Sequence, residues 1–212
     1  MIDIPTQAAP VLPPFVDLGG TAVFALSGAL LAARLNQTFV TCAFFALLTG
    51  VGGGSVRDAL LGVPAFWLRD MYVAPVILLT ALIAWFTPRR WWDGRWLEWA
   101  DAIGLAVFCT LGTAKALAFG VAPIPAIILG IVTGCVGGIF RDVIAGVPSI
   151  LMRPELYVTA AALAAGTCAI LLLLGLPQGL AMGIAAFAGF VLRAAALHFS
   201  IELPAYGGQR ES

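Results

Sequence analysis

Two short segments of this sequence combine glycines with an adjacent arginine and aspartate. The first is GGGSVRD at 52–58, and a near copy, VGGIFRD, occupies 136–142. Each lies toward the end of an apolar stretch, where a glycine weakens a helix by up to about 1 kcal/mol relative to alanine and a charge in lipid costs about 3 kcal/mol. Backbone carbonyls, hydroxyls and charges are the groups that replace water around a small ion or polar solute. The two segments are therefore candidates for handling a polar species inside apolar surroundings.

The composition places these surroundings in a lipid bilayer. The 212 residues are 61% hydrophobic and 10% charged, whereas about 25% of residues in soluble domains are charged. The formal net charge of zero argues against a nucleic-acid partner. A single histidine, His198, and four dispersed cysteines in apolar runs offer little for hydrolytic or metal chemistry. We therefore expect no enzyme activity, no metal site and no cofactor.

Seven apolar segments are candidates for membrane helices, which need roughly 20 residues to cross about 30 Å of hydrocarbon. They are 15–33, 38–61, 72–87, 98–117, 122–145, 156–175 and 178–200. The sequence therefore predicts an all-α integral membrane protein with seven transmembrane helices.

The first half of the chain aligns with the second without a gap after a shift of 84 residues, the separation of Asp17 and Asp101. DLGGTAVFALSG, which starts at Asp17, aligns with DAIGLAVFCTLG. TGVGGGSVRDALLGVP, which starts at Thr49, aligns with TGCVGGIFRDVIAGVP, which starts at Thr133. An alignment of this kind indicates an internal duplication.

Each copy holds three helices, so the second copy must enter the membrane from the opposite side. The sequence thus predicts an inverted 3+3 repeat plus a seventh helix, an architecture in which transport sites lie at the repeat interface near the midplane. The expected divisions are an exposed tail at 1–14, repeat 1 at 15–87, a cytoplasmic linker at 88–100, repeat 2 at 101–175, the seventh helix at 176–200 and a tail at 201–212.

Arginines predict the orientation, because cytoplasmic loops of membrane proteins are rich in basic residues. Most follow the odd-numbered segments, which places the N-terminus outside and the C-terminus in the cytoplasm of a bacterial inner membrane. Arg57 and Arg69 depart from this rule, which indicates that something other than orientation retains them.

The glycines allow two interpretations. Small residues let two membrane helices cross at close range. Alternatively, a bend or local unwinding frees carbonyls that must then face protein or water, and a pathway for cations or small polar solutes would run there. The candidate residues of this pathway are the glycines and the neighbouring hydroxyls: Thr49, Gly52, Gly53, Gly54, Ser55, Thr133, Gly137 and Gly138.

The charged residues are predicted to form two ion pairs between helices, Asp17 with Arg57 and Asp101 with Arg141. Neighbours in sequence point about 100° apart on a helix, so we do not expect Arg57 to pair well with Asp58, nor Arg141 with Asp142. The pairs either clamp helix ends or contact the permeant species.

Lys115, in LGTAKALAFG, has no basic counterpart in the first copy, where Leu31 occupies the equivalent position. Its side chain either extends to the membrane surface or points into the pathway, where it could gate or sense voltage.

The doubled GGxxRD motif, GTAKAL and the three-plus-three-plus-one layout resemble the prokaryotic trimeric intracellular cation (TRIC) channel family. The resemblance covers about Asp17 to His198. It implies a homotrimer with a pore in each subunit, lined by the glycine-bent second and fifth helices. It also implies that K⁺ and Na⁺ are the permeant ions, bound transiently rather than as cofactors, and that Lys115 matches a lysine linked to gating. Bacterial relatives carry a glycine-transporter label, so a secondary transporter of a small zwitterion is the alternative.

Overall fold

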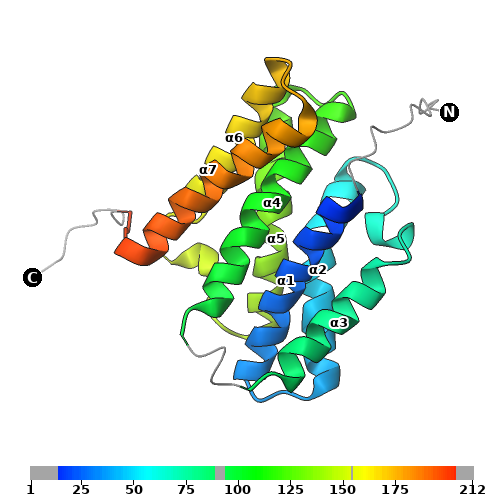
Figure 1. Ribbon diagram of the computed structural model, residues 1–212, viewed down its shortest axis with the longest axis vertical. Coiled ribbons are helices and arrows are strands. Elements are labelled where there is room, and N and C mark those ends of the chain that lie inside the picture. The colour runs from blue at the N-terminus through cyan, green and yellow to red at the C-terminus, as the bar shows by residue number, and fades with distance from the viewer. Residues whose placement is uncertain (1–13, 89–93, 154, 204–212) are drawn as a thin grey trace, which may run out of the picture.

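Seven α-helices form the computed structural model, which describes residues 14–88, 94–153 and 155–203 (Figure 1). Regular structure in these residues is helical, apart from an isolated bridge between Glu155 and Glu202. The predicted tail before Pro14, the centre of the linker and the end of the C-terminal tail lie outside the described residues. The helices are α1 (Pro14–Arg34), α2 (Phe39–Leu60), α3 (Val73–Phe86), α4 (Trp96–Ala118), α5 (Pro123–Ala145), α6 (Val158–Leu173) and α7 (Gln178–Phe199), with short 3₁₀ helices η1 (Phe66–Leu68) and η3 (Ile150–Met152).

The helices have the lengths and apolar surfaces of a membrane protein. Helices α2, α4, α5 and α7 are each long and apolar enough to cross a bilayer, and α3 and α6 are shorter apolar helices. Large apolar side chains such as Phe86 and Phe187 are exposed on the outside of the bundle, where lipid replaces water. The predicted all-helical, seven-helix membrane fold is confirmed.

The two repeats face each other across a pseudo-two-fold axis. Phe24 of α1 stacks on Phe108 of α4, its equivalent in the second repeat, with ring centroids 5.1 Å apart. The contacts around this stack are reciprocal, because a side chain at Gly20 would meet the ring of Phe108 and one at Gly104 would meet the ring of Phe24. Each repeat contributes three helices, so this axis lies in the membrane plane. The predicted inverted repeat is confirmed.

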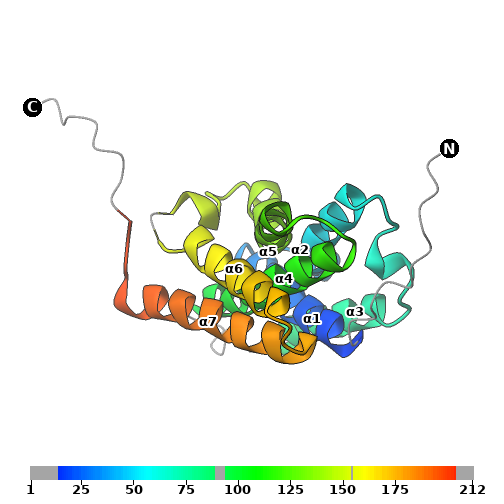
Figure 2. The ribbon, with the colours of Figure 1, turned by 90° about the horizontal axis from the view of Figure 1, so that it is seen from above.

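Helix α7 has no counterpart in the first repeat. It packs along α6 and α4 on the side of the molecule opposite α5 (Figure 2). The contact with α6 is tight, since a Cβ atom at Gly189 would lie 2.6 Å from the Cβ of Ala164. Among the described residues, the seventh helix thus packs mainly on the second repeat.

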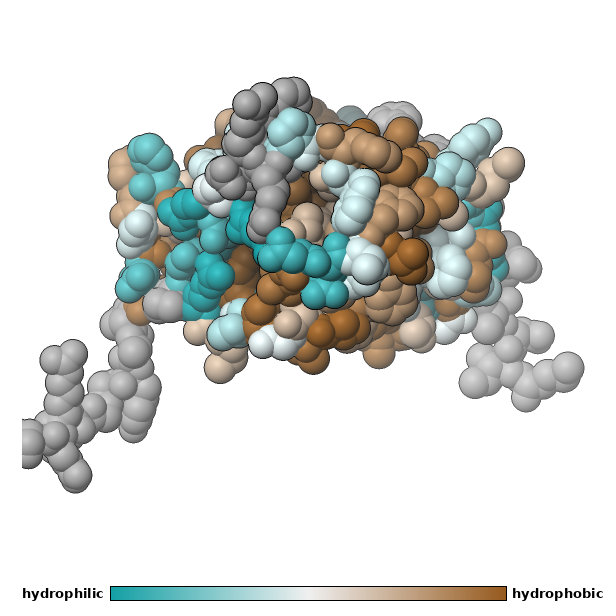
Figure 3. Space-filling model, turned by 90° about the horizontal axis from the view of Figure 1, so that it is seen from below, coloured by the Kyte–Doolittle hydropathy of each residue, from teal (hydrophilic) through white to brown (hydrophobic). Residues whose placement is uncertain are grey.

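Polar side chains gather at the end of the bundle that carries the α1–α2 turn and the start of α4 (Figure 3). Exposed residues here include Asn36, Gln37 and Thr38. Arg95 and Arg153, half exposed, both pair with Glu98 of α4. This end has the character of a membrane–water interface.

Candidate functional site

Helices α2 and α5 cross at two glycines with their backbones in direct contact. A Cβ atom at Gly53 would lie 1.9 Å from the carbonyl oxygen of Thr133, and one at Gly137 would lie 2.5 Å from the carbonyl oxygen of Thr49. Gly53 and Gly137 are equivalent positions of the repeat, as are Thr49 and Thr133, so the crossing sits on the pseudo-two-fold axis. No side chain fits between the helices at this point. We call this contact the glycine crossing.

The glycines do not interrupt either helix. Both α2 and α5 are continuous α-helices through them, so the expectation of local unwinding is wrong and the tight crossing is confirmed. An unbroken helix keeps its carbonyls hydrogen-bonded, which in lipid avoids a cost of several kcal/mol per group. Close backbone packing compensates for the low helix propensity of glycine. A bend at these positions stays a prediction.

Three consecutive glycines are needed because each faces a different neighbour. Successive residues of a helix point about 100° apart. Gly52 faces the ring of Phe140, Gly53 faces Thr133, and Gly54 faces the ring of Phe66 in η1, 2.5 Å from where a Cβ atom would lie. Gly54 therefore makes room for η1 rather than for α5.

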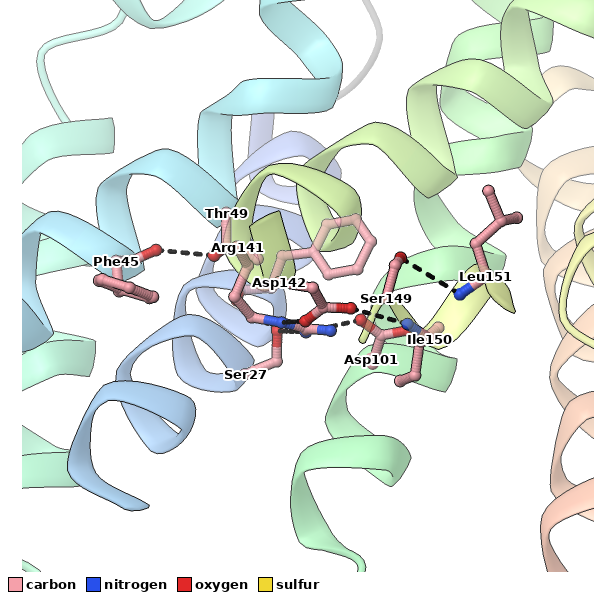
Figure 4. Close-up of polar contacts among 10 residues, drawn as sticks. Ser27, Phe45, Thr49, Asp101, Arg141, Asp142, Ser149, Ile150 and Leu151 are labelled. Atoms are coloured by element: carbon pink, nitrogen blue, oxygen red, sulfur yellow. Dashed lines mark hydrogen bonds and ion pairs between the residues drawn. The ribbon is translucent and has the colours of Figure 1, made fainter. Parts of the chain in front are cut away.

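The hydroxyl groups predicted for the site are turned back onto their own helices. Thr49 donates a hydrogen bond to the carbonyl of Phe45 (2.7 Å), as Figure 4 shows, and Thr133 donates to Leu129 (2.6 Å). Ser55 donates to Val51 and accepts a hydrogen bond from the indole of Trp67. Thr49 and Thr133 are fully buried. Their hydroxyl oxygens face Gly28 of α1 and Gly112 of α4, each 2.5 Å from where a Cβ atom of that glycine would lie.

Arg141 is held by three oxygen atoms at the end of α5 (Figure 4). Its guanidinium lies 2.7 Å from Asp101 of α4, 2.8 Å from Asp142 and 3.0 Å from the hydroxyl of Ser27 of α1. The second oxygen of Asp142 accepts a hydrogen bond from the backbone of Ile150 in η3. All these charged groups are buried. The predicted pair between Asp101 and Arg141 is confirmed, and Ser27 is a partner that the sequence analysis missed.

Adjacent arginine and aspartate residues do pair in both motifs, contrary to expectation. Arg57 Nε lies 2.7 Å from Asp58, and Arg141 Nε lies 2.8 Å from Asp142. The Cβ atoms diverge, but the long arginine side chain curves around the helix and brings Nε to the neighbouring carboxylate. In both copies the aspartate also accepts from the backbone eight residues later, at Phe66 or Ile150. Each aspartate thus ties its arginine to the following 3₁₀ helix.

The predicted pair between Asp17 and Arg57 is not formed. Within the described residues, Asp17 Oδ1 and both terminal nitrogens of Arg57 are buried without a hydrogen-bond partner. Two differences between the repeats account for this. Leu111 stands where Ser27 would be, so no hydroxyl helps to orient Arg57, and Lys115 stands where Leu31 would be and occupies Asp58.

Lys115 reaches from α4 to the end of α2. Its amine donates a hydrogen bond of 2.7 Å to Asp58 Oδ1, the same atom that Arg57 contacts, and its side chain is 19% exposed. The side chain is therefore turned inward rather than extended to the membrane surface. Asp58 and Lys115 were both singled out from the sequence, but the contact between them was not predicted.

A third buried arginine, Arg193 of α7, is a further polar group that the sequence analysis missed. It lies 2.8 Å from Glu155 and over the ring of Tyr157 at 5.2 Å. A charge in the middle of the seventh apolar segment was the signal that could have revealed it. This contact joins α7 to the segment before α6.

These features define a helical membrane protein built as an inverted repeat around a closed glycine crossing with charged residues on either side. The fold is that of the TRIC channels, as the sequence predicted. A structure of the TRIC trimeric intracellular cation channel orthologue from Rhodobacter sphaeroides matches 89% of this chain and 98% of its own, with 35% identity and a TM-score of 0.81. A second TRIC cation channel structure matches 94% of this chain and 99% of its own, with 27% identity and the same TM-score.

Sequence relatives give the family. A family model described as "Glycine transporter" matches twice, at residues 14–89 and 98–173. The UPF0126 membrane protein of Vibrio cholerae is 38% identical over 197 residues, 90% of this chain and 81% of the relative. The UPF0126 inner membrane protein YadS of Escherichia coli K12 is 40% identical over 151 residues, 69% of this chain and 72% of the relative. The chain belongs to the family that this model describes, together with the UPF0126 membrane proteins.

Proposed function

We propose that the protein is a cation channel of the bacterial inner membrane, a homotrimer with a pore in each subunit that conducts K⁺ and Na⁺. The observation that carries the proposal is the likeness to the Rhodobacter sphaeroides orthologue, which is named a trimeric intracellular cation channel and shares 35% identity over nearly its whole length. The proposed orientation, with the N-terminus outside, follows from the distribution of arginines.

The proposed pathway runs between α1, α2, α4 and α5, through the glycine crossing. Burying polar groups in a membrane protein is expensive unless they have partners or line a pathway. Most of the buried hydroxyl groups lie on these four helices, and one, Thr80, lies on α3. The residues on the four helices are Thr21, Ser27, Thr49, Thr110, Thr113 and Thr133. No ring of carboxylates accompanies them, which suits weakly selective conduction of monovalent cations.

In this proposal the conformation described above is closed. The backbones at Gly53 and Gly137 leave no space between α2 and α5. Opening therefore requires the two helices to separate or to bend where glycines make bending least costly. In the proposed open state the hydroxyls of Thr49 and Thr133, which now face Gly28 of α1 and Gly112 of α4, would become available to a partly dehydrated cation.

The salt bridge between Lys115 and Asp58 is the proposed gating contact. It joins α4 to the end of α2, one of the two helices that must move. A charge that crosses the whole membrane field gains about 2.3 kcal/mol per 100 mV, so even a partial displacement of this lysine would couple voltage to the position of α2.

A planar-bilayer recording of the purified protein tests the proposal. In symmetric KCl, voltage ramps should give discrete currents. In a KCl gradient, the reversal potential of these currents should lie close to the equilibrium potential of K⁺. Lys115→Ala should change the voltage dependence of opening, whereas Lys115→Arg, which keeps the charge, should preserve most of it.

A silent bilayer, together with saturable uptake of glycine into liposomes, would overturn the channel proposal in favour of a transporter. If Lys115→Ala leaves the voltage dependence of the currents unchanged, Lys115 has no role in gating.

A further inference from the structure

The two repeats hold equivalent charged residues in two different arrangements. In the second repeat, Arg141 binds Asp101 at 2.7 Å. In the first, the equivalent Arg57 and Asp17 are both buried at their polar ends, yet neither Asp17 Oδ1 nor the terminal nitrogens of Arg57 has a hydrogen-bond partner among the described residues. One copy of the pair is closed and the other is open.

An open pair of this kind is costly to maintain. A buried charged group without its partner loses the hydration that it would have in water, and charged hydrogen bonds are the strongest of the polar contacts in proteins. Arg57 retains its bond to Asp58 and lies over the ring of Phe66, 5.7 Å from its centroid. Its two terminal nitrogens remain available to an acceptor.

The closed pair shows what the first repeat lacks. Arg141 receives a third oxygen from Ser27, whereas Leu111 is the equivalent residue near Arg57. Asp142 binds only Arg141 among side chains of the described residues, whereas Asp58 Oδ1 is shared between Arg57 and Lys115. Arg57 thus lacks the supporting hydroxyl that Arg141 has, and the aspartate that holds it is shared with a second cation. These are the conditions for an arginine that can exchange partners.

We propose that Asp17 and Arg57 form a two-state latch between α1 and α2, which is open in the conformation described here and closed, as Asp101 and Arg141 are, in a second conformation. Closure of the latch moves the outer end of α1 toward α2. Only the link between this movement and conduction rests on the proposed function.

Distances between spin labels test the latch without any measurement of current. Gly19 is exposed, with space around its Cβ position, and Leu60 at the end of α2 is 67% exposed, so cysteines at these positions can carry labels. The equivalent positions of the second repeat, Ile103 and Ile144, are also exposed and form the matched control. The protein is measured in lipid nanodiscs by double electron–electron resonance.

The 19–60 pair should give two distances, and the 103–144 pair should give one. Asp17→Glu lengthens the carboxylate toward Arg57 and should increase the fraction of molecules that show the shorter 19–60 distance. Asp17→Asn removes the charge and should decrease that fraction. The ratio of the two populations should differ about tenfold between these variants, as expected for one charged hydrogen bond. Asp17 Oδ1 has no hydrogen-bond partner among the described residues, so neither variant removes a hydrogen bond between this atom and those residues.

A single 19–60 distance that neither variant changes would overturn the latch, as would a shift in the same direction for both. If the populations respond as expected while bilayers stay silent, the latch stands and the channel proposal fails.

Discussion

Arg57 and Arg141 occupy equivalent positions in nearly identical motifs, yet their surroundings differ. Arg141 hydrogen-bonds to Asp101, Asp142 and Ser27, whereas among the described residues Arg57 hydrogen-bonds through its side chain to Asp58 only. The difference comes from residues outside the motifs, on α1 and α4. An isolated motif therefore predicts which residues are charged but not how they are paired.

Asp101→Asn should destabilise the protein by about 3 kcal/mol, because it leaves the buried Arg141 with one carboxylate fewer. The measurement is the melting temperature of the purified protein in detergent. Asp17→Asn is the matched control and should change the melting temperature little, because Asp17 Oδ1 has no hydrogen-bond partner in the part of the chain that the structure describes. Equal losses for the two variants would mean that both pairs are formed in the resting protein.

At the scale of single helices, the sequence predicted the elements well and their contacts only in part. Hydrophobic length sets where a membrane helix begins and ends, so the predicted segments agree with α1–α7 to within a few residues. The role of the glycines could not be decided in the same way. Crossing and unwinding need the same small residues, and only the backbone of Thr133 opposite Gly53 distinguishes them.

The departure from symmetry at Val136 has a similar explanation. At its equivalent, Gly52, a Cβ atom would lie 3.0 Å from the ring of Phe140, so a larger residue there would have to displace this ring. The residue equivalent to Phe140 is the smaller Val56. A valine at 136 is therefore compatible with the shorter side chain at 56, and two substitutions that look unrelated in the sequence compensate each other across the axis.

Gly53→Ala should be among the most disruptive single substitutions in the chain. The added methyl would overlap the carbonyl oxygen of Thr133, and backbone cannot move aside without separating α2 from α5, a cost of about 3 kcal/mol or more. Yield and melting temperature of the purified variant measure this cost. Gly166→Ala in α6, where nothing lies within 4 Å of the Cβ position, should be neutral or stabilise by up to about 1 kcal/mol. If Gly53→Ala melted like Gly166→Ala, the crossing would have to be looser than described.

At the scale of the whole molecule, the inverted repeat was predictable because the duplication aligns without a gap. The attachment of α7 was not, because it has no equivalent in the first repeat with which to compare it. Its polar contacts join Arg193 to Glu155 and Tyr157, which lie far from Arg193 in the sequence and within or beside another apolar segment. A single charge in such a segment indicates a buried partner without identifying it.

The proposed assembly is a homotrimer, and native mass spectrometry of the protein released from nanodiscs should give three copies. The expectation rests on the trimeric orthologue named above. A complex of one or two copies, under conditions in which bilayers still record currents, would show that each subunit conducts without the others.

The reciprocal contacts of the two repeats have a consequence for the shape of the current–voltage curve. A pathway lined by an inverted pair presents nearly the same surface to ions that arrive from either side, so its conductance would be almost symmetric. In the proposed channel, rectification must therefore originate where the repeats differ, and next to the charged clusters those positions are Lys115, equivalent to Leu31, and Ser27, equivalent to Leu111. The direction of any rectification is therefore set by the few positions at which the two repeats have diverged.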